Sequence, residues 1–353
     1  MTEVTIVGDE VRTVAGSVGP GTLLVPPASL PDAVGWELKP SGLCRGDVCV
    51  PVANPAGLLV DGMVDLAAVA TALGREVVVD PAAGLVAFSL PSEERRRALE
   101  GLRAPAVTLP DLDGSPHRFD EWRGRKRLLV AFSSWCGCRE DLPGWQALHD
   151  ELSPYGFTVI AVAIDHTPEV VRPFTDGISY PVLYDPQHLL TELYAISNVP
   201  TVVWIDEEDR IVRPNSYAFG TDTFASFTGV EAAPHLDAVR SWVRHGVLPQ
   251  PADEVRGSVA DLSDDEVRAR LHFRIASEAH RRGDGDVVRE HLALATALAP
   301  DDLTVWRAAM PLLGEDPFGD AFFERYDRWQ AQGSPFHGLP ALGRDGPDGA
   351  VRG

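Results

Sequence analysis

Residues 127–143 read Arg-Leu-Leu-Val-Ala-Phe-Ser-Ser-Trp-Cys-Gly-Cys-Arg-Glu-Asp-Leu-Pro. The apolar run 128–132 predicts a buried strand, and the apolar residues of 139–152 recur at helical spacing. Cys136 and Cys138 lie where the strand meets the helix. Unpaired N–H groups and the helix dipole favour an anion at a helix N-terminus, so a thiol there ionises more readily. The thiolate is the nucleophile of disulfide exchange, and the stretch therefore predicts redox chemistry.

Residues 134–139, with Pro143 five residues after the second cysteine, resemble the Trp-Cys-Gly-Pro-Cys-Arg active site of the thioredoxin superfamily. Within it they are most similar to the ResA/TlpA-like disulfide reductases. The chain departs from that pattern because it has Cys-x-Cys instead of Cys-x-x-Cys. It also resembles a cysteine version of the Trp-Ala-x-x-U-Gly-Cys motif, where U is selenocysteine, of a ResA-like group. We expect Cys136 to attack, Cys138 to resolve the mixed disulfide, and Trp135 to shield one side of the reactive sulfur.

A second motif lies far downstream, at Val199-Pro200-Thr201. In thioredoxin-like proteins a cis-proline in this context lies beside the reactive cysteine, and its neighbouring backbone pairs with the substrate. A cis peptide is essentially a proline property. The resemblance therefore implies that Val199 and Pro200 shape the substrate groove.

The spacing of the two cysteines sets their expected redox behaviour. With only Gly137 between them, a Cys136–Cys138 disulfide closes a tight ring, and strained disulfides are more oxidising. The access of glycine to positive φ lowers the cost of that closure. The motif predicts a relatively high reduction potential or resolution by an external thiol.

The central part of the chain, residues 104–247, predicts a thioredoxin-like α/β domain. Residues 107–122 resemble the first hairpin of redoxin domains. The apolar run 157–164 predicts a strand covered on both faces, and helices and strands alternate as far as residue 243. Such alternation predicts a central sheet with helices on both faces.

The two flanking regions predict separate structures. Residues 1–90 predict an α+β domain, whose second half resembles the copper amine oxidase N-terminal (stalk) domain, and 91–103 predict a linker. Residues 255–334 predict a helical segment containing one helix pair that resembles a tetratricopeptide repeat. We expect this pair to pack on its neighbouring domain or to offer a face to a protein partner. Residues 335–353 predict a disordered tail.

Cys44 and Cys49 allow three interpretations. A small-loop disulfide or two packed thiols is favoured over a metal half-site, because residues 1–100 contain no histidine. A second dithiol that exchanges electrons with Cys136 and Cys138 is the third. No metal or organic cofactor is predicted.

Composition limits the partners. The net charge of −21 argues against binding to nucleic acid or to an anionic membrane, since both need a basic face. The sequence shows neither a secretory signal nor a long apolar run, which predicts a cytoplasmic protein. The expected partners are thiols or disulfides of proteins or small molecules.

Other functions remain open. A thiol-dependent peroxidase with an antioxidant role is one, because Ser133 lies three residues before Cys136 as in peroxiredoxins, although Leu129 stands where their proline would be. A redox-inactive adaptor is another, with the flanking regions doing the binding.

Overall fold

The computed structural model describes residues 2–343 and forms two compact units. Unit 1 runs up to Glu93 and includes Leu262–Pro300; unit 2 contains Glu94–Asp261 and continues from Asp301. The stretch 255–334, expected as one helical segment, is therefore shared. Of its first two helices, which belong to unit 1, α9 (Asp264–Arg282) packs on the strands and α10 (Gly285–Leu298) packs on α9; its last two helices belong to unit 2.

Unit 1 contains a seven-stranded sheet of order β7-β8-β3-β2-β1-β10-β9, in which β1 and β10 are parallel and the other pairs antiparallel. Its strands are β1 Thr2–Val7, β2 Val11–Gly19, β3 Thr22–Val25, β7 Leu59–Val60, β8 Met63–Asp65, β9 Val77–Asp80 and β10 Leu85–Phe88. A second sheet contains β4 Glu37–Lys39, β5 Gly42–Arg45 and β6 Val48–Val50. Its helical elements are η1 Pro27–Ser29, α1 Leu30–Val34, η2 Pro55–Leu58, α2 Leu66–Ala72, α9 Asp264–Arg282 and α10 Gly285–Leu298, where η marks a 3-10 helix.

Local sequence explains the ends of the predicted helices. The Asp65 side chain accepts a hydrogen bond from the Ala67 N–H at 2.8 Å and so caps α2. Ser263 and Glu266 form a capping box at the start of α9, and Gly283, with φ of 75°, ends it.

The predicted helix pair is present as α9 and α10. Its likeness to a tetratricopeptide repeat stays a prediction, as does the likeness of residues 1–90 to the stalk domain.

Cys44 and Cys49 form a disulfide across the β5–β6 hairpin, where they are direct register partners. Cys44 is buried in unit 1, whereas Cys49 is exposed. The turn lies between them, with a strand on each side.

Unit 2 contains a five-stranded sheet of order β15-β14-β13-β16-β17, in which β13, β14 and β15 are parallel and β16 and β17 are antiparallel to their neighbours. These five strands are β13 Lys126–Phe132, β14 Phe157–Ala163, β15 Val182–Tyr184, β16 Thr201–Ile205 and β17 Ile211–Ser216. A separate hairpin in unit 2 contains β11 Thr108–Pro110 and β12 Pro116–Arg118. Its α-helices are α3 Ser92–Leu99, which begins two residues before the unit, α4 Leu142–Leu152, α5 Leu189–Leu193, α6 Ala225–Thr228, α7 Ala233–His245, α8 Ala252–Val255, α11 Leu303–Leu312 and α12 Asp320–Ala331. Its 3-10 helices are η3 Phe119–Trp122, η4 Gly137–Asp141, η5 Ser153–Tyr155, η6 Pro168–Val170 and η7 Arg172–Phe174.

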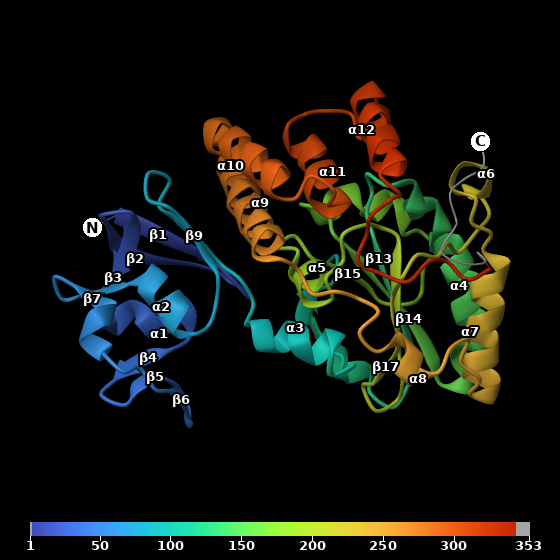
Figure 1. The fold of residues 1–353 in the computed structure, drawn as a ribbon, viewed down its shortest axis with the longest axis horizontal. Helices are drawn as coiled ribbons and strands as arrows, with labels where there is room; N and C mark the ends of the chain where they lie inside the picture. The colour runs from blue at the N-terminus through green and yellow to red at the C-terminus, as the bar shows by residue number, and fades with distance from the viewer. Residues whose placement is uncertain (1, 344–353) are drawn as a thin grey trace. The chain divides into compact units, whose positions relative to one another are not determined.

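Helices cover both faces of this sheet, as the apolar strands require. Figure 1 shows α4 and α7 along one side of the sheet and α5 on the other. On the α7 side, Trp204 of β16 stacks on Trp242 with ring centroids 5.1 Å apart. Trp145 of α4 and Trp204 are fully buried, so large aromatic rings fill this layer.

The prediction of a disordered tail is wrong for residues 335–343. Leu339 forms a β-bridge with Ser216, and the His337 N–H donates to the Ser197 hydroxyl at 3.0 Å. These partners satisfy backbone groups that would otherwise need water, and they hold the segment against unit 2. Residues 344–353 of the predicted tail lie outside the described residues.

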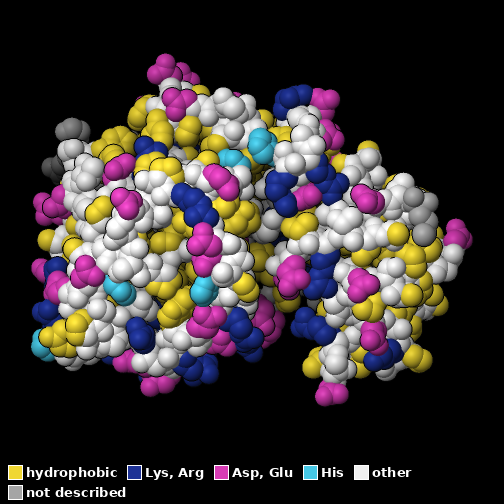
Figure 2. Space-filling model, turned by 180° about the vertical axis from the view of Figure 1, so that it is seen from behind, with side chains coloured by type: hydrophobic (Ala, Val, Ile, Leu, Met, Phe, Trp, Pro, Cys, Tyr) yellow, Lys and Arg dark blue, Asp and Glu magenta, His cyan; other side chains and the backbone are white. Residues whose placement is uncertain are grey.

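The described surface has mixed charge. On the face shown in Figure 2, acidic and basic side chains are interspersed and do not separate into large patches. Among the described residues, no helix combines the length and the apolar character needed to cross a bilayer.

The Cys44–Cys49 disulfide gives the first prediction. Replacing both residues (Cys44→Ala with Cys49→Ser) should lower the free energy of unfolding by about 2 kcal/mol, because a small loop is no longer closed in the unfolded chain. Urea titration followed by circular dichroism measures this. An unchanged unfolding curve would show that the bond contributes nothing to stability.

Candidate active site

Cys136 and Cys138 lie at the turn between β13 and the helical stretch formed by η4 and α4. Cys136 is the N-cap of η4, and its sulfur accepts a hydrogen bond from the Cys138 N–H at 3.4 Å. Both thiols are free, and they are 6% and 2% exposed, respectively. The more exposed Cys136 sulfur is therefore the better placed of the two to meet a substrate.

The loop before Cys136 is fixed by Asp165, which follows β14. One carboxylate oxygen of Asp165 accepts hydrogen bonds from the hydroxyls of Ser133 at 3.0 Å and Ser134 at 2.6 Å. The Ser134 N–H donates to the other oxygen at 3.0 Å. Burial raises the pKa of Asp165 to about 6 although these donors oppose the shift. The parallel pairing of β13 with β14 thus places a polar anchor under the cysteine loop.

The second predicted motif lies beside the first. The Val199–Pro200 peptide is cis, and the Cys136 sulfur is 3.5 Å from the Val199 carbonyl oxygen. Pro200 and Asn198 line the cavity into which Cys136 opens. The structure therefore brings Cys136, Cys138, Val199 and Pro200 together.

Trp135 takes a different place from the one expected. It is 4% exposed and does not line the cavity, and the guanidinium carbon of Arg307 lies 5.7 Å from its ring centroid. Trp135 therefore contacts the site through Arg307. A direct contact of its ring with substrate stays a prediction.

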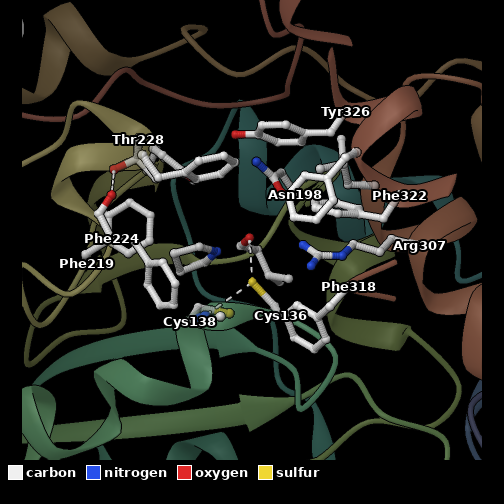
Figure 3. A pocket seen from close by; sticks show the side chains of 17 residues that line it. Cys136, Cys138, Asn198, Phe219, Phe224, Thr228, Arg307, Phe318, Phe322 and Tyr326 are labelled. Atoms are coloured by element: carbon white, nitrogen blue, oxygen red, sulfur yellow. Dashed lines mark hydrogen bonds between the residues drawn. The ribbon is translucent and has the colours of Figure 1, made fainter. Parts of the chain in front are cut away.

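A cavity of about 300 Å³ lies over Cys136, and its walls are mostly aromatic (Figure 3). One wall comes from the segment after β17 and contributes Tyr217, Phe219, Phe224 and Phe227. The other comes from α12 and the loop before it, and contributes Phe318, Phe322, Phe323 and Tyr326. The rings of Phe227 and Tyr326 stack with centroids 5.4 Å apart, so the two walls meet over the cavity.

Helix α11 is attached directly to the segment that precedes the cis-proline. The Leu303 N–H donates to the Ser197 carbonyl at 2.8 Å, and the Thr304 hydroxyl donates to the Ile196 carbonyl at 3.2 Å. This attachment fixes the first turn of α11 and places Arg307, one turn further on, at the cavity.

Arg307 brings a positive charge to the cavity. Its guanidinium lies 3.7 Å from the ring centroid of Phe322, and it donates to the Pro317 carbonyl at 3.2 Å. Figure 3 shows the guanidinium directed toward the Cys136 sulfur. Sequence reasoning missed this residue because an arginine on an amphipathic helix carries no signal of its own. The aromatic spacing of residues 318–329 was the available clue, but it equally predicts helix packing.

The environment favours ionisation of Cys136 over Cys138. Burial raises the pKa of Cys136, but the hydrogen bond from the Cys138 thiol, the charge of Arg307 and the Cys138 N–H together lower it to about 7. Burial and then the bond to Cys136 raise the pKa of Cys138 well above its usual value. At neutral pH a large fraction of Cys136 is therefore thiolate, whereas Cys138 stays protonated.

Gly137 is required for a different reason from the one expected. It does not take a positive φ in this structure, where the cysteines are unbonded. A Cβ at Gly137 would lie 2.6 Å from the tip of the Phe224 ring. The absence of a side chain thus lets the aromatic wall approach the two cysteines.

The central part of the chain is similar to known proteins. Residues 99–230 match the Redoxin family. The thiol-disulfide oxidoreductase ResA of Geobacillus thermodenitrificans is 26% identical over 123 residues, which cover 34% of this chain and 71% of the relative. ResA of Halalkalibacterium halodurans is 28% identical over 139 residues, covering 38% and 79%. A crystal structure of a DsbE-type thiol:disulfide interchange protein from Chlorobium tepidum is 27% identical, with a TM-score of 0.30, and covers 31% of this chain and 79% of that one.

Unit 2 accordingly contains a domain with a thioredoxin-like fold, and this domain is similar to Redoxin-family proteins and to ResA proteins. The protein is an oxidoreductase. Among the described residues, no group of three or more His, Cys, Asp or Glu side chains is arranged to hold a metal ion.

The lowered pKa of Cys136 predicts the pH profile of its reactivity. Because only the thiolate reacts, alkylation of Cys136 by iodoacetamide should rise with pH with a midpoint of about 7. Rates are measured by mass spectrometry between pH 5 and 10 in the wild-type protein and in the Cys138→Ala variant, which lacks a side-chain donor at this position. Loss of the Cys138 donor should move the midpoint upward. A midpoint near 9 in the wild type would contradict the assigned electrostatics.

Proposed function

We propose that the protein exchanges dithiols for disulfides through Cys136 and Cys138. The observation that supports this most strongly is the position of the Cys136 sulfur. It opens to the cavity, lies 3.5 Å from the carbonyl before the cis-proline, and accepts the Cys138 N–H. The lowered pKa of Cys136 supplies the thiolate that the reaction needs.

The reaction proceeds in two displacements. The Cys136 thiolate attacks one sulfur of a substrate disulfide, forms a mixed disulfide and releases the first substrate thiolate. Cys138 then loses its proton, attacks the Cys136 sulfur and releases the second thiolate. Two electrons pass from the dithiol to the substrate. An external thiol or dithiol reductant reverses these steps on the protein and completes turnover.

The peroxidase alternative has less support. The Ser133 hydroxyl, which would have to assist a peroxide, donates instead to buried Asp165 at 3.0 Å. The position of Leu129 lacks the proline of the peroxidase motif. The adaptor alternative, and a protein partner on the helical segment, stay predictions.

A cytoplasmic location also stays a prediction. The Cys44–Cys49 bond is a feature more typical of oxidising compartments, because cytosolic thiols are usually kept reduced. We propose that this bond is structural and does not take part in the electron path.

The two roles are tested in a Cys44→Ala, Cys49→Ser background, where Cys136 and Cys138 are the remaining thiols. After reduction and mixing with 2-hydroxyethyl disulfide, the background protein should lose two hydrogens and gain no adduct. With Cys138→Ser added, a mercaptoethanol adduct should accumulate on Cys136. With Cys136→Ser added, the rate should fall by at least about a hundredfold, because the ionised nucleophile is gone.

Mass spectrometry distinguishes these products. The assignment fails if the Cys136→Ser protein reacts as fast as its parent, or if the adduct forms on Cys138. It also fails if the background protein, with the Cys44–Cys49 pair removed, has lost exchange altogether.

A further inference from the structure

Six of the 17 residues that line the cavity over Cys136 lie outside the Redoxin match. That match ends at residue 230, whereas Arg307, Phe318 and Phe322 come from the later part of unit 2. The likeness to ResA proteins therefore says nothing about what this part of the cavity binds. The side chains themselves must be examined for their ligand preference.

Arg307 is a buried cation with no carboxylate partner among the described residues. It is 7% exposed, its Nε has no hydrogen-bond partner, and its other contacts are the Pro317 carbonyl and aromatic rings. A buried charge without a counterion is unfavourable. When the Cys136 thiolate becomes a neutral mixed disulfide, Arg307 loses the one anion that faces it. An anionic group on the substrate would then replace that anion.

The rest of the cavity favours a flat apolar group. Its eight aromatic side chains offer ring faces and edges, which bind aromatic groups in stacked or edge-to-face geometry. Phe227, Phe318 and Phe323 are 49%, 38% and 43% exposed, so apolar surface is available beside the cavity. A volume of about 300 Å³ lies at the lower end of the range for small-molecule pockets.

We propose that the cavity selects small aromatic disulfides that carry a carboxylate, with the ring between the aromatic walls and the carboxylate on Arg307. This proposal rests on the disulfide exchange proposed above and names its substrate class. A planar guanidinium is suited to a carboxylate because it can donate two parallel hydrogen bonds. Contact between Phe227 and Tyr326 restricts access for a bulky protein segment.

The exchange with such a substrate is balanced without any further group. The Cys136 thiolate forms a mixed disulfide with one aryl sulfur and releases one aryl thiolate. Cys138 displaces the second aryl thiolate, and its proton passes to solvent. A dithiol such as dithiothreitol restores the reduced pair. Arg307 contacts the substrate carboxylate throughout and is not consumed.

Three disulfide probes test the selection in the Cys44→Ala, Cys49→Ser background. They are 5,5′-dithiobis(2-nitrobenzoate), which is aromatic and anionic, 4,4′-dithiodipyridine, which is aromatic and neutral, and 2-hydroxyethyl disulfide, which is neither. Their intrinsic reactivities differ, so each variant is compared with its parent on the same probe at the pH where both are fully thiolate. Stopped-flow absorbance follows the aromatic probes and mass spectrometry the third.

Arg307→Met should slow the anionic probe by about tenfold to a hundredfold, as expected for loss of a charge-assisted hydrogen bond, and the neutral probes by less than about threefold. Arg307→Lys should restore most of the rate with the anionic probe. Phe224→Leu should slow both aromatic probes by about twofold to tenfold more than it slows 2-hydroxyethyl disulfide. Equal slowing of all three probes by Arg307→Met would overturn the carboxylate site.

A measurement on the unsubstituted cavity removes any dependence on variant folding. Benzoate should compete with 4,4′-dithiodipyridine and slow its reaction, whereas benzyl alcohol at the same concentration should have a much smaller effect. Equal effects of the two, or none, would contradict the proposal. If the protein reacts with no probe, the proposed exchange itself has failed; reaction with all probes but no selectivity refutes only the substrate class.

Discussion

The site depends on how the sulfur of Cys136 is held. It accepts the Cys138 N–H from one side and lies against the Val199 carbonyl on the other, while Arg307 faces it across the cavity. Each contact comes from a different part of unit 2: the β13–η4 turn, the cis-proline segment and α11. Because three distant segments meet at one atom, the ionisation of Cys136 depends on the whole unit and not on the motif alone.

The C-terminal helices complete this arrangement. Helix α11 is fixed to the backbone just before the cis-proline, and α12 supplies the aromatic wall that faces Phe224 and Phe227. Without them the cavity would lose Arg307 and the wall that contains Phe322 and Tyr326. With them the Cys136 sulfur opens into a small aromatic cavity that holds one buried cation. We infer that these helices restrict and direct an exchange reaction whose chemistry the central domain supplies.

Strong apolar periodicity predicted the central sheet. The two spaced motifs predicted that Cys136 lies near Pro200. These patterns did not predict which strands α9 packs on, or that α11 completes the active site. Helix periodicity shows which face is apolar but not which surface covers it. Arg307 was missed for the same reason, since its role arises only from tertiary packing. The order of residues 335–343 was missed because its backbone partners lie far away in sequence.

The most direct measurement of the central claim is a redox titration of the full chain in dithiothreitol buffers, with alkylation and mass spectrometry of the peptide that contains Cys136 and Cys138. The account predicts that both thiols disappear together as one two-electron couple. The ratio of reduced to oxidised protein should then change tenfold for about every 30 mV of buffer potential. The account is contradicted if Cys138 stays a free thiol while Cys136 alone is modified, or if both remain reduced in the most oxidising buffer.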